Sequence, residues 1–345
     1  MITKVMSAAR NTNPGVVPPW LQGGYPAGPT AALAPVVVGR DAQGRPVTMN
    51  LPDGYVDREQ ARSEAIVEKV RDFYKGIGVT DAEGADPAAA VEFLPGLNNA
   101  EYLSGSSDGT EVDHVHIGID RTTGRSFNDA EEVVAHEWGH RVINRISNAS
   151  LSMDPRSEDV AIHESLADTF AAAYDGDDWT MGEDLGEPIR DMANPERLGH
   201  PGTMAELNDL MRPGTGFTHP IQIGPGRDDV ARGVDGAPIL VPDWHAVAGV
   251  PNKAASLIGD ALGRDTMAQI YLKALRDNVR PGQEIAGLAV ATMIASRDLF
   301  GADSKELRVT MEAWNAVGVL DDIKGRIDAR QAAVGARQIA SVIGR

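Results

Sequence analysis

The sequence predicts an α+β protein of two domains, an N-terminal mixed α/β domain followed by a mainly helical one. Apolar and polar residues alternate over 112–120, as in a half-buried strand. Apolar residues recur at helical spacing over 57–74, 129–147 and 157–174, and nearly continuously from residue 251 onward. The length of 345 residues also fits two packed domains better than one.

The N-terminal part is expected to contain an arm and the first domain. Residues 1–55 are rich in Pro and Gly and show little helical periodicity, so we expect an extended arm or a short prosegment-like region. Residues 56–150 form the expected N-terminal α+β domain. Its first helix is predicted over 57–74 and stops before Gly76.

The C-terminal part is expected to be mainly α over 151–320. Residues 176–243 are dense in Gly, Pro and Asp and are predicted to be rich in loops. Apolar residues in 321–345 recur at helical spacing, which predicts an additional amphipathic C-terminal helix. The helices predicted after the loops cover 251–263, 264–278, 283–300 and 303–316.

Composition narrows the classes of partner and compartment. A formal net charge of −18 argues against nucleic acid as a partner, because polyanions bind through Lys and Arg. No run approaches the roughly 18–20 apolar residues that span a bilayer, so we expect no membrane segment. The first thirty residues contain no apolar core of the secretory type, which predicts a cytoplasmic protein or non-classical export. With no cysteine, a metal must be held by His, Asp, Glu or backbone oxygen.

The segment DAEEVVAHEWGH carries the pattern of a catalytic zinc site. His136 and His140 are four residues apart, so on a helix both imidazoles can reach one ion. Glu137 then lies beside the ion, where a carboxylate can take a proton from zinc-bound water. Asp129 and Glu132 have the spacing of a capping box, which supports a helix here.

A catalytic zinc normally has a third protein ligand, and the next predicted helix supplies candidates. Glu164 is the preferred one, because Asp168 shares its helix face and could orient a histidine ligand. His163 is the alternative. As the neighbour of Glu164 it points about 100° away around the helix, and a packing role suits it better.

Several blocks resemble the thermolysin-like neutral metallopeptidases, within the gluzincins. The resemblance implies a two-domain fold with an active-site cleft between the domains, a zinc cofactor, peptide or protein substrates and, as an alternative localisation, secretion. VVPPWLQGG at 16–24 is similar to an element in the prosegments of protealysin-like members. The main blocks are LNNAEY at 97–102, VVAHEWGH at 133–140, HESLAD at 163–168, DWTMGED at 178–184 and MEAWNAVGVL at 311–320.

The resemblance assigns roles to further residues. His245 matches the histidine that stabilises the tetrahedral intermediate, and Arg190 matches the arginine that binds the substrate carbonyl. Asn99 and Ala100 match the edge that pairs with an extended substrate backbone. Asp168 matches the carboxylate behind the first histidine ligand.

Two further groups of positions follow from the resemblance. One group lines the family's pocket for the residue after the scissile bond and is apolar here, although it also fits a plain core: Val133, Met181, Leu185 and Ile189. The other group falls on or near family calcium positions and makes one Ca²⁺ plausible: Glu132, Asp175, Asp178 and Glu183.

The sequence departs from the family pattern near His245. No Tyr lies between His140 and Glu164, so the family's tyrosine that assists the oxyanion has no match. An insertion precedes His245, and Leu240 stands where the family has the Asp that orients it. Asp243 and Asp235 are the candidates to replace that Asp.

Together these features predict a zinc-dependent endopeptidase in which Glu137 activates the zinc-bound water, with a preference for an apolar residue after the scissile bond. Two alternatives stay open. One is an aminopeptidase of the wider gluzincin group, and the other is a non-proteolytic metallopeptidase-like binding or regulatory module. The sequence leaves the oligomeric state undetermined.

Overall fold

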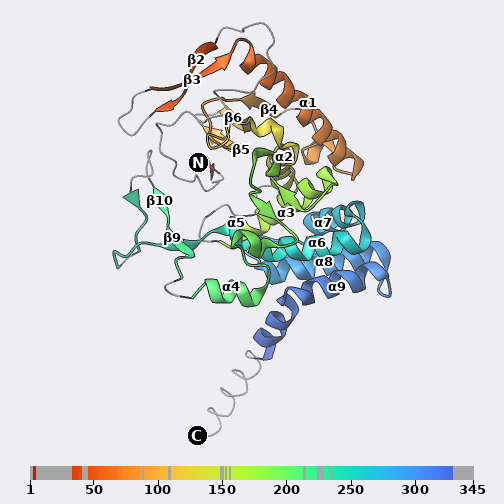
Figure 1. The fold of residues 1–345 in the computed structure, drawn as a ribbon. Coiled ribbons are helices and arrows are strands. Elements are labelled where there is room, and N and C mark those ends of the chain that lie inside the picture. The colour runs from red at the N-terminus through yellow and green to blue at the C-terminus, as the bar shows by residue number, and fades with distance from the viewer. Residues whose placement is uncertain are drawn as a thin grey trace. The chain divides into compact units, whose positions relative to one another are not determined.

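A computed structural model gives the fold as two compact units (Figure 1). One unit comprises the described residues of 1–153 and 166–191, and the other those of 154–165 and 192–345. The division falls within a single helix, α3 (Asp159–Asp175). The structure describes residues 3–4, 33–40, 46–87, 89–107, 110–147, 151, 154, 157–212, 215–223, 229–233 and 235–328.

The first unit is built on a four-stranded sheet of order β1-β5-β6-β4. Strands β5 (Ala100–Ser107) and β6 (Thr110–Ile117) are antiparallel, and β4 (Ala90–Phe93) runs parallel to β6. The short strand β1 (Thr3–Lys4) pairs with the other edge of β5. Helices α1 (Tyr55–Gly76) and α2 (Glu131–Ile146) both contact the sheet. The predicted prosegment motif at 16–24 lies outside the described residues.

Strand β6 ends earlier than the alternating pattern at 112–120 predicts. The chain leaves the sheet after Ile117, because the backbone at Gly118 comes very close to the carbonyls of Leu97 and Asn99. A Cβ at Gly118 would lie 2.1 Å from the Leu97 oxygen, so only glycine fits there. Ile119 then forms an isolated bridge with Ser126.

Helix α2 begins differently from the prediction. Asp129 and Glu132 do not form a capping box, because Ala130 is the N-cap and no side chain caps the helix. A short 3₁₀ turn (Phe127–Asp129), capped by Ser126, precedes it and displaces Asp129 from the cap position. Asp129 instead pairs with Arg62 at 2.6 Å, and Glu132 accepts a hydrogen bond from the backbone N–H of Gly182 at 2.8 Å.

The interior of the first unit fixes α2 on several sides. Arg141 is fully buried and donates to both Asp113 on β6 and Asp86. Tyr74 on α1 lies edge to face with Phe170 on α3, with ring centroids 5.8 Å apart. These contacts explain why nearly every residue of α2 is buried.

The second unit is mainly helical, and four of its helices pack against one another: α6 (Gly249–Leu262), α7 (Arg264–Asp277), α8 (Ile285–Phe300) and α9 (Lys305–Ala316). These agree with the predicted helices to within about two residues at each end, as is usual for helix termini. The buried Trp314 indole donates to the Thr292 hydroxyl at 2.7 Å, which joins α9 to α8.

Shorter elements fill the predicted loop region and its surroundings. Helices α4 (Met204–Leu210) and α5 (Trp244–Val247) were not predicted, because segments this short show too few turns for a periodic pattern. The two-stranded sheets pair β2 (Leu33–Arg40) with β3 (Pro46–Pro52), β7 (Thr180–Met181) with β8 (Arg190–Asp191), β9 (Thr218–Pro220) with β12 (Leu240–Pro242), and β10 (Gln222–Ile223) with β11 (Asp229–Val230). The remaining 3₁₀ turns are Asp81–Glu83, Glu183–Leu185 and Pro195–Leu198.

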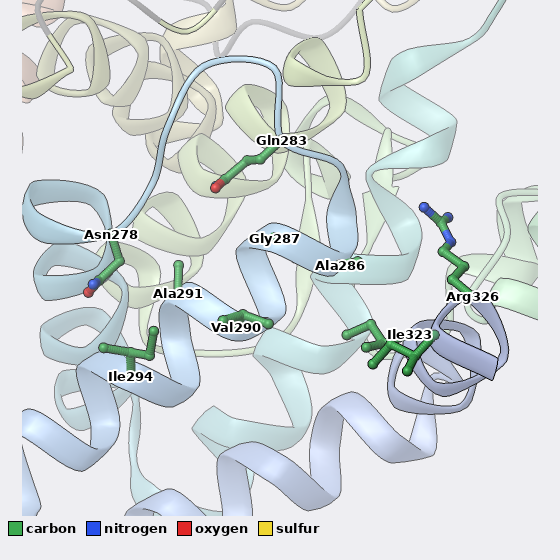
Figure 2. Close-up of a pocket in the computed structure, with 10 residues that line it drawn as sticks. Asn278, Gln283, Ala286, Gly287, Val290, Ala291, Ile294, Ile323 and Arg326 are labelled. Atoms are coloured by element: carbon green, nitrogen blue, oxygen red, sulfur yellow. The ribbon is translucent and has the colours of Figure 1, made fainter. Parts of the chain in front are cut away.

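After α9 the chain is helical again over 319–328, within the predicted C-terminal helix, and 329–345 lie outside the described residues. This segment and α8 line a pocket of about 440 Å³ (Figure 2). Its walls include Val290 and Ile294 from α8 and Ile323 from 319–328. Among the described residues, no helix is both long and apolar enough to cross a bilayer.

Candidate metal centre

Helices α2 and α3 bring together the three predicted metal ligands. His136 and His140 lie one turn apart on α2, both are buried, and their ring centroids are 4.5 Å apart. Glu164 is buried on α3, one turn before Asp168 on the same continuous helix. The ligand atoms of His136, His140 and Glu164 all lie within 4.8 Å of one another. His163 is fully buried and is not part of this set.

Asp168 orients the first histidine. Its Oδ1 lies 2.7 Å from Nδ1 of His136, so Nε2 is the nitrogen that remains to face an ion. The other oxygen of Asp168 lies 3.4 Å from Nε of Arg190, which is half-buried on β8. Arg190 also donates to its neighbour's carbonyl, at Ile189. The carboxylate of Asp168 is therefore held between an imidazole and a guanidinium.

The donor set fits zinc. Two imidazoles and one carboxylate are the ligands of one class of catalytic zinc site, in which a fourth position stays open for water or substrate. Calcium and magnesium prefer oxygen ligands alone, so two imidazoles disfavour them. Burial of all three side chains supplies the dry surroundings in which such a site holds its metal.

Glu137 is held by a chain of hydrogen bonds that begins on the sheet. The backbone N–H of Tyr102 on β5 donates to Oε2 of Glu137 at 2.8 Å. The Tyr102 hydroxyl donates to Asp113 at 2.9 Å, and Asp113 also accepts from Arg141 and Arg145. The position of Glu137 is thus tied to β5 and β6 as well as to its own helix.

The charges along this chain are fixed by their neighbours. Burial and the nearby Asp113 carboxylate raise the pKa of Tyr102 well above its usual range, so its hydroxyl remains a donor. Burial opposes ionisation of Asp113, but hydrogen bonds from Arg141 and Arg145 outweigh it and lower the pKa of Asp113. The sequence analysis included Tyr102 only as part of the LNNAEY block and assigned no role to Asp113. The one signal for Asp113 was its place in the alternating strand.

His245 lies on the four-residue helix α5. The N-cap of this helix is Asp243, whose Oδ1 accepts the N–H of His245 and lies 3.6 Å from its Nδ1. Nε2 of His245 lies 3.4 Å from Oε2 of Glu164. Asp235 instead accepts the N–H of Ala237 in its own turn. Of the two carboxylates considered from the sequence, Asp243 is the one beside His245.

The predicted substrate edge lies at the start of β5. Ala100 is buried and is the first residue of the strand, where it pairs with Ile117, and Asn99 immediately precedes it. On the opposite edge of β5, strand β1 pairs with Leu103 and Ser104. Described chain from the N-terminal arm therefore pairs with β5 shortly after Ala100.

The predicted specificity residues differ in exposure. Val133, Met181 and Leu185 are buried in the first unit, as expected of core residues. Ile189 is 41% exposed, and its side chain packs over Gly182. Only Ile189 among the four is open to solvent.

The calcium candidates surround a buried carboxylate. Burial, together with the negative charges of Glu183 and Asp175, raises the pKa of Glu132 to about 7. Asp178 accepts both the N–H and the hydroxyl of Thr180 at 2.7 Å. Although all four candidates are described, they supply no set of three ligand atoms within 4.8 Å of one another.

Comparison with known proteins gives a context for this geometry. A family model described as "Thermolysin metallopeptidase, alpha-helical domain" matches residues 154–319. Bacillolysin from Brevibacillus brevis is 27% identical over 289 residues, which cover 77% of this chain and 47% of the relative. The chain is thus similar to the thermolysin-like metallopeptidases, and the family model covers most of its second unit.

Further relatives agree with this family. Neutral protease NprE from Bacillus pumilus is 27% identical over 247 residues, which cover 69% of each chain. The precursor of protealysin, a metalloproteinase from Serratia proteamaculans, has a similar fold with a TM-score of 0.55 and 20% identity, covering 81% of this chain and 84% of that one. The predicted resemblance to this family and the predicted two-domain α+β fold are thereby confirmed. The chain spans about half the length of the bacillolysin that it matches.

Proposed function

We propose that this chain is a zinc-dependent endopeptidase. The observation that carries the proposal is the buried set of His136, His140 and Glu164, whose ligand atoms lie within 4.8 Å, with Glu137 adjacent to the first histidine. Similarity to the thermolysin-like metallopeptidases supports it. His136 and His140 would hold the ion with Glu164, and zinc supplies a Lewis acid that polarises the scissile carbonyl and lowers the pKa of a bound water.

Glu137 is the proton carrier in this proposal. The Tyr102 N–H holds Oε2 and so orients the carboxylate, which would accept a proton from the attacking water and pass it to the leaving amine. Since Tyr102 is itself anchored to Asp113, Glu137 needs little reorganisation to reach the reacting atoms. A residue that carries a proton in both directions benefits from such a fixed geometry.

His245 and Arg190 would stabilise the negative charge that develops on the oxygen of the scissile carbonyl. His245 would act through Nε2, while the Asp243 carboxylate, 3.6 Å from Nδ1, orients the ring. Arg190 would act partly through Asp168, because their side chains are in contact. In this proposal Asp243 orients His245, a role that the family gives to an Asp at the position occupied here by Leu240.

Substrate would bind as an added strand at Asn99 and Ala100, the start of β5. Ile189 is the exposed apolar side chain among the specificity candidates, which favours an apolar residue after the scissile bond.

The arm over 1–55 would act as a prosegment, because β1 already pairs with β5. One Ca²⁺ near Glu132 would relieve the repulsion that raises the pKa of this carboxylate.

The test is Glu137→Gln, with Glu131→Gln as the matched control on the same helix. Glu131 pairs with Lys69 at the surface and should be dispensable. We expect Glu137→Gln to keep its zinc and lose about 10² to 10⁴-fold in cleavage of a peptide whose two ends are blocked. Loss of zinc, or near-normal turnover, would contradict the role of Glu137. No cleavage of blocked peptides by the wild type, with or without the arm, would contradict the endopeptidase itself.

A further inference from the structure

A second group of metal-binding side chains lies on the sheet of the first unit. The register of β4 and β6 places Glu92 opposite His116, and His114 lies two residues before His116 on the same strand. Alternate residues of a strand point to the same face, so the three side chains share one face of the sheet. Val115, which lies between the two histidines, and Ile117, which follows them, are fully buried and belong to the other face of the sheet, which α1 and α2 contact.

The three side chains are close enough to share one ion. Their ligand atoms all lie within 4.8 Å of one another, and Nε2 of His116 is 3.7 Å from Oε2 of Glu92. Ligand atoms about 2.0–2.2 Å from a tetrahedral zinc are roughly 3.4 Å apart. The pair of His116 and Glu92 already has nearly this spacing, and the ligand atom of His114 lies within 4.8 Å of both.

A further carboxylate orients His116. Glu101 on β5 is paired with His116 across the sheet, is 6% exposed, and its Oε1 lies 3.6 Å from Nδ1 of His116. Nε2 of His116 is then the nitrogen that faces Glu92. The same relation of carboxylate, imidazole and open nitrogen holds for Asp168 and His136. It is the usual way in which proteins orient a histidine ligand.

We propose that Glu92, His114 and His116 form a second metal site, for a divalent late transition-metal ion such as Zn²⁺. Two imidazoles favour such ions over Ca²⁺ and Mg²⁺. Glu92 is 49% exposed, so water completes the coordination and the site binds more weakly than the buried set on α2 and α3. An ion here cross-links β4 to β6. The proposal does not depend on peptidase activity, because its ligands are distinct from those of the first site.

The experiment measures the zinc content of the full chain after dialysis at a series of buffered free Zn²⁺ concentrations. We expect two ions per chain in the wild type, with two different affinities. Glu92→Gln and His116→Ala should weaken only the weaker site, by at least about 10-fold. His140→Ala should remove the tighter ion and keep the weaker one. His219→Ala, which removes an exposed histidine from β9, should keep both.

The outcomes separate this site from the first one. If the wild type binds a single ion that His140→Ala removes, the sheet cluster is only an ion-paired histidine, and the proposal is wrong. If the weaker ion persists in Glu92→Gln and in His116→Ala, the ligands are wrongly assigned. Glu92 is at the surface, so Glu92→Gln still decides the question if His116→Ala misfolds. An inactive wild type that binds both ions would count against the proposed function alone.

Discussion

Helices α2 and α5 position their catalytic candidates in different ways. Helix α2 has 16 residues, is buried on nearly all sides, and holds Glu137 through packing and through the N–H of Tyr102. Helix α5 has four residues and holds His245 chiefly through its N-cap, Asp243. The first arrangement depends on packing along a long helix, and the second on a single turn that Asp243 caps.

This difference shows which site residues a sequence can reveal. In a long helix, spacing alone determines which side chains share a face, so His136, His140 and Glu137 can be assigned from their order. A helix of one turn has no such periodicity. The place of His245 depends on the fold around it, and the structure puts the carboxylate of Asp243 beside its ring.

The largest effect should come from Glu164, which contacts His245 and belongs to the ligand set with the α2 histidines. Structural zinc sites gain about 10–16 kcal/mol, or about 2.5–4 kcal/mol for each of roughly four ligands, so Glu164→Ala should weaken zinc binding by about 100- to 1000-fold and abolish turnover. His163→Ala, its buried neighbour on α3, should keep the zinc. Metal content after dialysis against a weak chelator tests both. Equal losses in the two variants would contradict the assignment of Glu164 as the ligand.

His245→Ala tests the contribution of α5. If His245 stabilises the oxyanion, its loss should lower kcat by roughly 100 to 1000-fold, about 2.7–4 kcal/mol, while zinc content and KM change little. Asp243→Asn keeps a capping oxygen but removes the negative charge near Nδ1, so a smaller loss is expected. Steady-state kinetics on one peptide measures both. A His245→Ala enzyme within a few-fold of wild type would show that α5 does not act in catalysis.

Sequence reasoning succeeded where local pattern determines structure. Spacing predicted the long helices and the three candidate metal ligands that the structure brings together, and the resemblance pointed to Asp168 behind His136. It failed at the start of α2, where the expected capping box of Asp129 and Glu132 is absent because tertiary contacts claim both side chains. It also missed the support of Glu137 by Tyr102, since a backbone N–H leaves no signal in the sequence.

Glu132, in the first turn of α2, should give the molecule a distinctive pH dependence. Its pKa rises from 4.5 to about 7 in the folded state, so the folded protein binds the proton more tightly than the unfolded one. The unfolding free energy should therefore fall as pH rises from about 4.5 to 7, by about 3 kcal/mol in total.

Glu132→Gln should remove this loss, so the variant should exceed the wild type in unfolding free energy by about 3 kcal/mol at pH 8 and match it near pH 4.5. Urea unfolding in calcium-free buffer measures the difference. Glu131→Gln is the control, because hydrogen bonds from Lys69 and Tyr174 lower the pKa of Glu131 despite its partial burial. If Ca²⁺ binds here, adding it should stabilise the wild type at pH 8 and leave Glu132→Gln unchanged.

The smallest effect concerns Gly139, which lies between Glu137 and His140 and tests whether packing fixes α2. A Cβ at Gly139 would lie 2.9 Å from the Tyr74 hydroxyl and 3.2 Å from Cα of Ala167 on α3. Tyr74 is fully buried and the Ala167 atom is backbone, so neither can move away easily. Gly139→Ala should therefore destabilise the fold by about 1–3 kcal/mol, although alanine favours helices.

Gly76→Ala is the matched control, because Gly76 is the last residue of α1 and a Cβ there meets no atom within 4 Å. It should be neutral or stabilising by up to about 1 kcal/mol. Zinc affinity provides the second readout. Ala167 immediately precedes Asp168 on α3, so a Cβ that pushes α2 away from Ala167 also moves His136 away from Asp168. Gly139→Ala should weaken zinc binding, and Gly76→Ala should not. A Gly139→Ala protein with wild-type stability and zinc affinity would show that α2 tolerates displacement, and its contrast with α5 would then rest on the hydrogen bond from Tyr102 alone.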